Sequence, residues 1–143
     1  MWGAGYTELF FLDEPTALAA GHRPCFECRR EAAKAFLAAF PNSAGFGADA
    51  MDEVLHRERL TNGRKRIWRS RLAELADGTL IVWEGRGHAV CSGRVAPWSF
   101  EGYGAPLTLG SAIEVDVLTP PSTVRALAAG YRPQWAPMVQ APP

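Results

Sequence analysis

The stretch Ala17-Leu-Ala-Ala-Gly-His-Arg-Pro24 is repeated almost unchanged as Ala126-Leu-Ala-Ala-Gly-Tyr-Arg-Pro133. In each copy, alanine and leucine favour a short helix, and the glycine can adopt the left-handed backbone conformation that ends it. The Arg-Pro pair that follows redirects the chain. We interpret both octets as structural corners that pack against a common sheet. Only the first copy is followed by cysteines, so any cysteine chemistry is added to a corner that the chain also uses without them.

Helical patterns dominate the first half of the chain. They predict, in order, a buried strand over Tyr6–Leu12, a helix capped by Asp13 that runs through Ala20, a helix from Pro24 to about Phe40, and an amphipathic helix over Ala48–Leu60. The last of these is ended by the pair Asn62-Gly63, which favours a turn.

Strand patterns dominate the second half. They predict strands at Thr79–Glu84, His88–Gly93 and Ile113–Leu118, turns at Asp77-Gly78 and Gly85–Gly87, and a C-terminal helix in the second octet. The expected fold is a single α+β domain over residues 1–133 with a small, mainly antiparallel sheet. A Pro-rich tail over residues 134–143, extended or disordered, is expected to follow it.

Length and composition limit the class of protein. The chain has 143 residues, of which 48% are hydrophobic, and this is enough for one domain with a core. Its apolar runs are too short to cross a membrane, and no signal-peptide pattern opens it. Three cysteines do not make a disulfide framework, so we expect a cytoplasmic setting.

Basic residues are concentrated between Arg57 and Arg71, although the net charge is zero. Such a cluster is either a solvated face that pairs with the acidic Asp49, Asp52 and Glu53, or a phosphate-binding patch. The second hypothesis predicts that DNA or RNA backbone is bound without sequence choice. Its candidate contacts are Arg23, Arg29, Arg30, Arg64, Lys65, Arg66 and Arg69.

The segment from His22 to Cys28, His-Arg-Pro-Cys-Phe-Glu-Cys, is the clearest chemical motif. Two cysteines at this spacing can hold one tetrahedral metal ion such as zinc, and His22 is a candidate third ligand. His88 and Cys91 have the same three-residue spacing and form an alternative half-site for a metal ion. In a flat strand, however, residues three apart face opposite sides, so this pair would need a local turn to bind one ion. His56 lies off the apolar face of its helix and is interpreted as a solvated residue.

Two other hypotheses stay open for Cys25 and Cys28. On a helical wheel they share a face with Ala32, Ala35, Phe36 and Ala39, which predicts buried cysteines in a protein-interaction module. Alternatively, Cys25 at a helix N-terminus would have a lowered pKa and act as a reactive thiol in a redox protein. Phosphate loops, nucleophile elbows and paired catalytic carboxylates are absent from the sequence, so an enzyme is not the leading hypothesis.

The segment Leu9–Arg30, which contains Phe10-Phe11-Leu12 and Gly21-His-Arg-Pro-Cys-Phe-Glu-Cys28, resembles the second half of the zinc-binding domain of Ada-type DNA repair proteins. That family binds one zinc through four cysteines and contacts the DNA backbone. The resemblance implies that Cys25 and Cys28 are zinc ligands and that DNA is a partner. The family's first cysteine pair, which includes the methyl acceptor, has no counterpart here, so no methyl transfer is expected. The whole chain also resembles an uncharacterised bacterial protein family that shares Tyr6–Arg30 and Val117–Pro133, and this implies no function.

Overall fold

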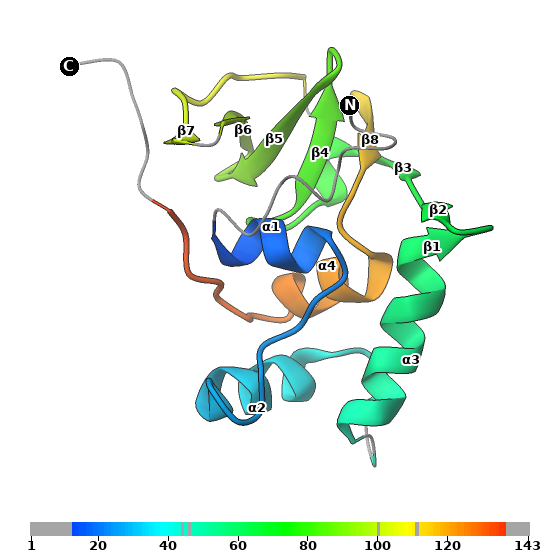
Figure 1. Ribbon diagram of the computed structural model, residues 1–143. Helices are drawn as coiled ribbons and strands as arrows, with labels where there is room; N and C mark the ends of the chain where they lie inside the picture. Colours follow the sequence, from blue (N-terminus) through cyan, green and yellow to red (C-terminus); the bar gives the residue numbers. More distant parts are fainter. Residues whose placement is uncertain (1–12, 44, 46, 100, 111, 137–143) are drawn as a thin grey trace.

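The computed structural model describes residues 13–43, 45, 47–99, 101–110 and 112–136. The strand expected at Tyr6–Leu12 lies outside these residues. Within them, helices pack below a twisted sheet (Figure 1), which confirms the α+β class. The helices are α1 (Glu14–Ala19), α2 (Arg30–Ala39), α3 (Ala48–Arg59) and α4 (Pro121–Ala128). None of the described helices is long and apolar enough to cross a membrane.

The main sheet is antiparallel throughout its described strands. In spatial order these are β3 (Trp68–Arg71), β8 (Glu114–Val117), β4 (Leu80–Trp83), β5 (Arg86–Cys91), β6 (Arg94–Ser99) and β7 (Gly102–Tyr103). Strands β4, β5 and β8 confirm the three sequence predictions, whereas β3, β6 and β7 were not predicted. The turn after β4 is Glu84-Gly85, with both residues at positive φ, and Arg86 and Gly87 belong to β5. The turn predicted at Gly85–Gly87 is therefore displaced towards β4.

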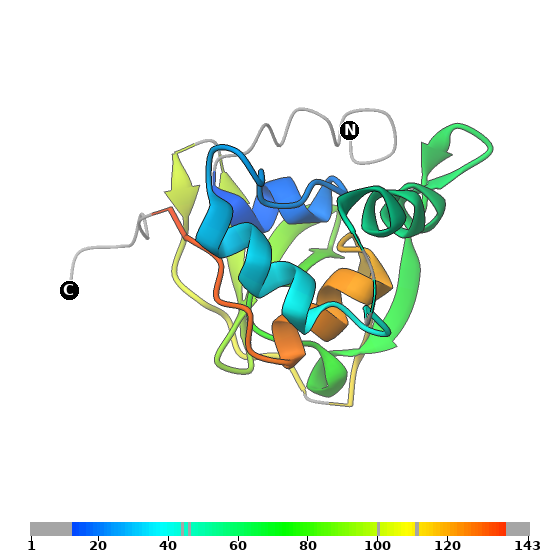
Figure 2. The same ribbon diagram turned by 90° about the horizontal axis from the view of Figure 1, so that it is seen from below.

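A second, two-stranded sheet follows α3 directly. Strands β1 (Leu60–Thr61) and β2 (Arg64–Lys65) are joined by Asn62-Gly63, the predicted breaker. Both turn residues have positive φ, 52° and 77°, and Asn-Gly is a preferred pair for such a two-residue hairpin. The hairpin projects from the body of the protein beside the end of α3 (Figure 2). We call residues 60–67 the basic hairpin.

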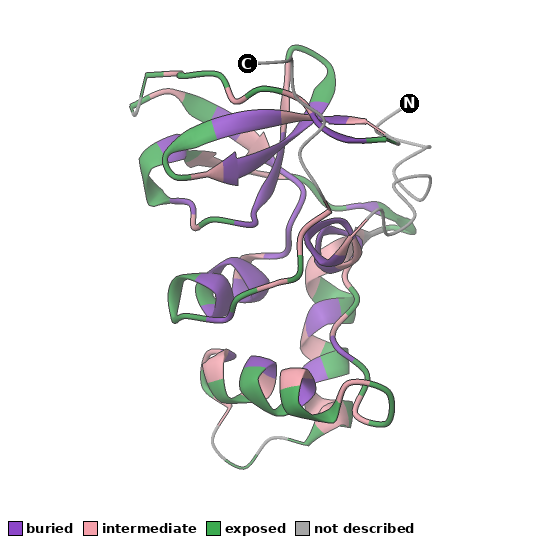
Figure 3. Cartoon of the chain, turned by 90° about the vertical axis from the view of Figure 1, so that its left-hand side faces the viewer, coloured by how far each residue is buried: buried purple, intermediate pink, exposed green. Residues whose placement is uncertain are grey.

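The hydrophobic core lies between the main sheet and the helices, where buried residues face one another in both layers (Figure 3). Leu80 of β4 packs with Ala19 of α1, and Val124 of α4 packs with Val117 of β8. A second cluster joins the helices and contains Leu18, Phe36, Phe40, Met51, Leu55, Ala126, Leu127 and Tyr131. Helices α1 and α4 therefore both contact the sheet and the outer helices α2 and α3.

The two octets form the same backbone corner. In the first, Gly21 N–H donates to Leu18 O at 3.0 Å and His22 N–H donates to Ala17 O at 3.0 Å. In the second, the corresponding bonds from Gly130 and Tyr131 are both 3.1 Å. Both glycines have positive φ, +93° and +117°. This geometry confirms the interpretation as paired corners, which we call the N-terminal corner (Ala17–Pro24) and the C-terminal corner (Ala126–Pro133).

Helix α2 begins later than predicted. It runs from Arg30 to Ala39, not from Pro24, and the preceding residues Cys25–Cys28 form a separate turn. Arg29 has φ −136° and ψ 64°, which lies outside the helical region and separates the turn from the helix. The face that α2 buries therefore contains Ala33, Phe36 and the following Phe40, and both cysteines lie outside it.

The segment after the C-terminal corner is held against α1 as far as it is described. Gln134 N–H donates to Glu14 at 2.9 Å, and Ala136 N–H donates to the Asp13 carboxylate at 2.8 Å. Trp135 packs edge-on against Tyr103, with ring centroids 5.4 Å apart. These contacts hold residues 134–136 of the segment that was predicted as a tail.

Candidate functional site

Cys25 and Cys28 lie side by side in the turn between the N-terminal corner and α2. Both are exposed, and neither forms a disulfide. The Cys28 N–H points at Cys25 Sγ, 3.3 Å away, and the Cys28 thiol is hydrogen-bonded to the same sulfur. The prediction that the cysteines are buried is wrong, because the chain enters α2 only after Cys28.

The two thiols have different acidities. Backbone N–H groups of Cys28 and Glu27 and the Cys28 thiol stabilise a thiolate at Cys25, so the pKa of Cys25 is lowered. The same neighbouring sulfur raises the pKa of Cys28. Deprotonation therefore begins at Cys25, whose sulfur already has its hydrogen-bond donors in place.

Cys25 also lines a cleft of about 650 Å³ between the N-terminal corner and α3. His22 and Arg23 line it on the corner side, and Asp52 and His56 line it on the α3 side. Arg23 crosses to Asp52 through two hydrogen bonds, from Nε at 2.8 Å and from Nη2 at 3.0 Å. Burial, and then the Arg59 cation, lower the pKa of His22. The Arg23–Asp52 ion pair was not predicted from the sequence. The spacing of Asp52 and His56, four residues apart in α3, does predict that these two residues share one helix face.

The candidate metal ligands fit a zinc site only in part. Zinc prefers sulfur and nitrogen ligands in a tetrahedral arrangement, and the paired thiols of Cys25 and Cys28 suit two of the four positions. Among the described residues, no three His, Cys, Asp or Glu side chains are grouped so as to hold a metal ion. His22 therefore lies near the motif in sequence but is not gathered with the two sulfurs.

The alternative half-site in β5 is not assembled. His88 is buried, with Nδ1 2.8 Å from Arg86 O, and it pairs across the sheet with Pro97. Cys91 is half-buried at the other end of the same regular strand. Because side chains alternate along a strand, these two residues project to opposite faces, as the sequence predicted.

Four of the predicted phosphate contacts have hydrogen-bond or ion-pair partners within the protein. Arg23 pairs with Asp52, Arg29 pairs with Glu14 at 2.8 Å, and Arg69 pairs with Asp116 at 2.9 Å and with Glu114 at 3.6 Å. Lys65 is buried, and its Nζ donates to Ala19 O at 2.6 Å. Burial and the Arg59 cation lower the pKa of Lys65 to about 7. Within the described residues, these side chains serve the fold, because each of them joins two separate elements.

The other three predicted contacts are more open. Arg30, Arg64 and Arg66 are exposed, and none of them has an ion-pair partner among the described acidic groups. Arg64 and Arg66 flank the buried Lys65 in the basic hairpin. The Arg66 side chain donates to Arg57 O at 3.3 Å, which directs it along the end of α3.

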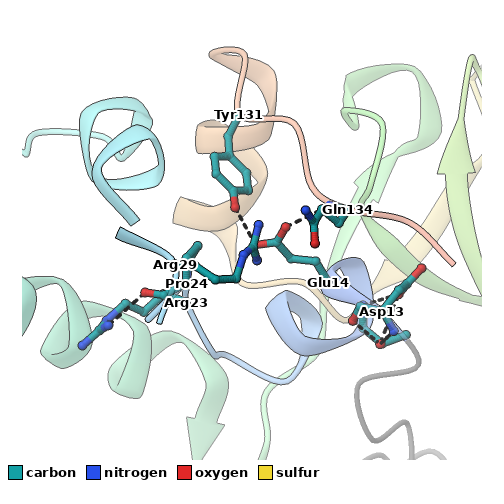
Figure 4. Close-up of polar contacts among 8 residues, drawn as sticks. Asp13, Glu14, Arg23, Pro24, Arg29, Tyr131 and Gln134 are labelled. Carbon is teal, nitrogen blue, oxygen red and sulfur yellow. Dashed lines mark hydrogen bonds and ion pairs between the residues drawn. The ribbon is translucent and has the colours of Figure 1, made fainter. Parts of the chain in front are cut away.

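Glu14 links the motif to the C-terminal corner (Figure 4). This buried carboxylate accepts hydrogen bonds from the Tyr131 hydroxyl and the Gln134 N–H, and it pairs with Arg29, directly after Cys28. Burial and Glu14 both raise the pKa of Tyr131. The sequence does not reveal this network, because Glu14 lies more than a hundred residues from Tyr131 and Gln134.

Comparisons with protein-family models, curated proteins and solved structures give no match for this chain.

Proposed function

We propose that this protein is a metal-binding module that holds zinc through Cys25 and Cys28. The observation that carries the proposal is the exposed thiol pair, in which the Cys28 backbone N–H already points at Cys25 Sγ and, with the Glu27 N–H, stabilises a thiolate there. Hydrogen bonds from outside the ligand set orient metal ligands, and a sulfur fixed in this way loses little freedom when it binds. One zinc ion bound by both sulfurs would hold the turn before α2 in a single conformation.

The exposure of Cys25 and Cys28 favours metal binding over a role as buried structural residues. Two thiols at a surface, hydrogen-bonded to each other, are accessible to an ion, whereas small core residues are not. A redox dithiol would use the same two residues, and the test must separate these two outcomes. Zinc binding keeps both sulfurs reduced, while a redox couple requires them to form a disulfide.

The proposal is tested by titrating the reduced protein with Co²⁺ and then displacing it with Zn²⁺. We expect one ion per chain and a thiolate-to-cobalt charge-transfer band that Cys25→Ser and Cys28→Ser both abolish. Cys91→Ser is the matched control and should bind like the wild type. The absence of a band, or a band that survives both replacements, contradicts the proposal. Rapid, reversible Cys25–Cys28 disulfide formation without metal uptake would favour the redox hypothesis.

A second function, contact with nucleic-acid phosphate, is supported by the basic hairpin. Arg64 and Arg66 stand on a projecting two-stranded element, and neither is neutralised by a described carboxylate. Arginine forks onto phosphate oxygens, and a hairpin fixed by an Asn-Gly turn holds both side chains in place. Arg64 and Arg66 of the basic hairpin are therefore the candidate surface, and Arg30, at the start of α2, is a separate exposed candidate.

Binding of labelled duplex DNA and RNA, measured by anisotropy over a range of salt concentrations, tests this second function. Arg64→Glu with Arg66→Glu should weaken binding and reduce the slope of log affinity against log salt by about two units. The matched control carries the same charge change at two exposed arginines elsewhere, Arg94→Glu with Arg125→Glu. Equal effects of the two double variants, or no binding at low salt, would rule out a hairpin interface.

A further inference from the structure

We propose that Cys25 is a site of S-thiolation, where a small disulfide of the glutathione type forms a mixed disulfide that Cys28 then resolves. This inference concerns the metal-free protein and goes beyond the zinc function proposed above. It follows from a difference between the two thiols. Cys25 lines the cleft between the N-terminal corner and α3, whereas Cys28 is not among the described residues that line it.

The cleft gives a small molecule a route to the Cys25 sulfur. Its volume of about 650 Å³ lies within the range of small-molecule sites in proteins. Cys25 is exposed, while Cys91, the cysteine of β5, is half-buried. Because thiol modification follows exposure, Cys25 is the cysteine that a molecule in the cleft would reach first.

The lining of the cleft carries charges of both signs. Arg23 supplies a cation on the corner wall, next to the Asp52 carboxylate that it binds at 2.8 Å. Asp49 adds a second carboxylate and Arg59 a second cation, both from α3. Glutathione disulfide carries ammonium and carboxylate groups, so each kind of charge on the ligand has an opposite charge in the lining. The cleft therefore suits a zwitterionic disulfide better than an apolar one.

Cys28 is placed to complete the reaction from the other side of Cys25. Its backbone N–H lies 3.3 Å from Cys25 Sγ, and its thiol is hydrogen-bonded to that sulfur. In the first step, the Cys25 thiolate bonds to one sulfur of the small disulfide, whose S–S bond breaks and releases one glutathione that takes up a proton. In the second step, the Cys28 thiolate attacks the Cys25 sulfur and displaces the other glutathione, which is also protonated. Two protein thiols are oxidised, and one small disulfide is reduced to two thiols.

Zinc and the small disulfide compete for the same sulfurs. Zinc binding requires both as thiolates, whereas the second step joins them in a Cys25–Cys28 disulfide. The zinc-bound and oxidised forms therefore exclude each other, and the reaction belongs to the protein without metal.

Intact-mass spectrometry of the reduced, metal-free full chain tests this inference, with oxidised glutathione as the probe. The wild type should lose two hydrogen atoms through a transient adduct of one glutathione. Cys28→Ser removes the resolving thiol, so this variant should accumulate a stable adduct that peptide mapping places on Cys25. Cys25→Ser should react about tenfold more slowly or less, although Cys28 is still exposed, because exchange depends on access.

Two matched controls separate the cleft from general exposure. Cys91→Ser should react like the wild type. In the Cys28→Ser background, Asp49→Trp narrows the cleft and should slow adduct formation, whereas Glu31→Trp, at an exposed position of α2 outside the cleft lining, should not. An unreactive wild type, equal adduct formation at Cys25 and Cys28, or an unchanged rate in Asp49→Trp would each overturn the inference.

The result is distinguishable from that of the metal titration. Zinc uptake by a chain that glutathione disulfide does not modify when metal-free would overturn this inference and leave the zinc function standing. Modification of Cys25 by a chain that takes up no metal would overturn the zinc function and support this inference. Circular dichroism of each variant before oxidation shows that a changed rate is not caused by misfolding.

Discussion

The N-terminal and C-terminal corners share a backbone but differ in the residue that follows the glycine. His22 is exposed, while Tyr131 is buried and donates its hydroxyl hydrogen to Glu14. After the proline, the first corner leads into the cysteine turn, and the second leads into a segment that crosses α1. The corner itself is therefore scaffolding. The residue after the glycine is exposed in the first corner and closes over the core in the second.

The largest expected effect concerns Glu14, where the two corners meet. Glu14→Ala removes the acceptor for Tyr131 and Gln134 and the partner of Arg29, and should lower the free energy of unfolding by about 2–4 kcal/mol. Urea denaturation measures this, with Glu31→Ala, at an exposed position of α2, as the control. A cost as small as that of the control would show that the corners are stable without their link.

The glycines should differ in how much they tolerate a side chain. Gly21→Ala and Gly130→Ala each place alanine at positive φ, with a cost of about 1–2 kcal/mol. Gly21→Ala should cost more, because its Cβ meets Arg59, whereas no described atom lies within 4 Å of a Cβ at Gly130. In a double-mutant cycle, combining Gly21→Ala with Arg59→Ala should remove the extra destabilisation of Gly21→Ala relative to Gly130→Ala. Equal costs would mean that Arg59 moves aside freely.

Lys65 donates from Nζ to Ala19 O in the N-terminal corner, so its titration should affect the stability of that region. Its pKa is about 7 in the folded protein and 10.5 ordinarily. Between these values the unfolded chain binds more protons than the folded one, so this group makes stability rise from pH 7 towards pH 10. Lys65→Met should flatten that rise in denaturation measured across the range, while Lys34→Met at an exposed site should not. Parallel pH profiles for the wild type and Lys65→Met would contradict the lowered pKa.

The smallest expected effect is at the cysteines in metal-free protein. Because both are exposed, Cys25→Ser and Cys28→Ser should leave the free energy of unfolding close to that of the wild type. With zinc present, the wild type should gain thermal stability that both variants lack. A large loss without metal would instead indicate that the thiol pair stabilises the turn by itself.

Local signals made much of the fold predictable. The Asp13 cap, the two glycine corners and the Asn-Gly break each act within a few residues, and the structure confirms all of them. Strand β6 escaped prediction because Pro97 argues against a strand, yet it pairs opposite His88 inside the sheet. Strand β3 escaped because two of its four residues are arginines, and one of them, Arg69, pairs across strands with Asp116.

The cysteine pair can be found in the sequence, but its surroundings cannot. The spacing of Cys25 and Cys28 predicts that both sulfurs bind the same ion. Their exposure, however, depends on where α2 begins, and the non-helical backbone angles of Arg29 set that point. Likewise, arginine clustering predicts a charged surface, but Arg23 finds Asp52 only through tertiary packing of segments 29 residues apart. Sequence patterns identify chemical groups, whereas the fold determines which of them are already engaged.

The binding of the C-terminal segment by Asp13 and Glu14 has a consequence for biosynthesis. The bonds that hold α1 to Tyr131, Gln134 and Ala136 span 117, 120 and 123 residues. A ribosome that adds about 5–20 residues per second needs roughly 6–25 s to make the chain between them. Throughout that interval Asp13 and Glu14 lack their C-terminal partners and have only local ones, the Thr16 N–H for Asp13 and the Arg29 guanidinium for Glu14. The thiols therefore emerge from the ribosome well before Arg29 can be fixed by the completed network around Glu14.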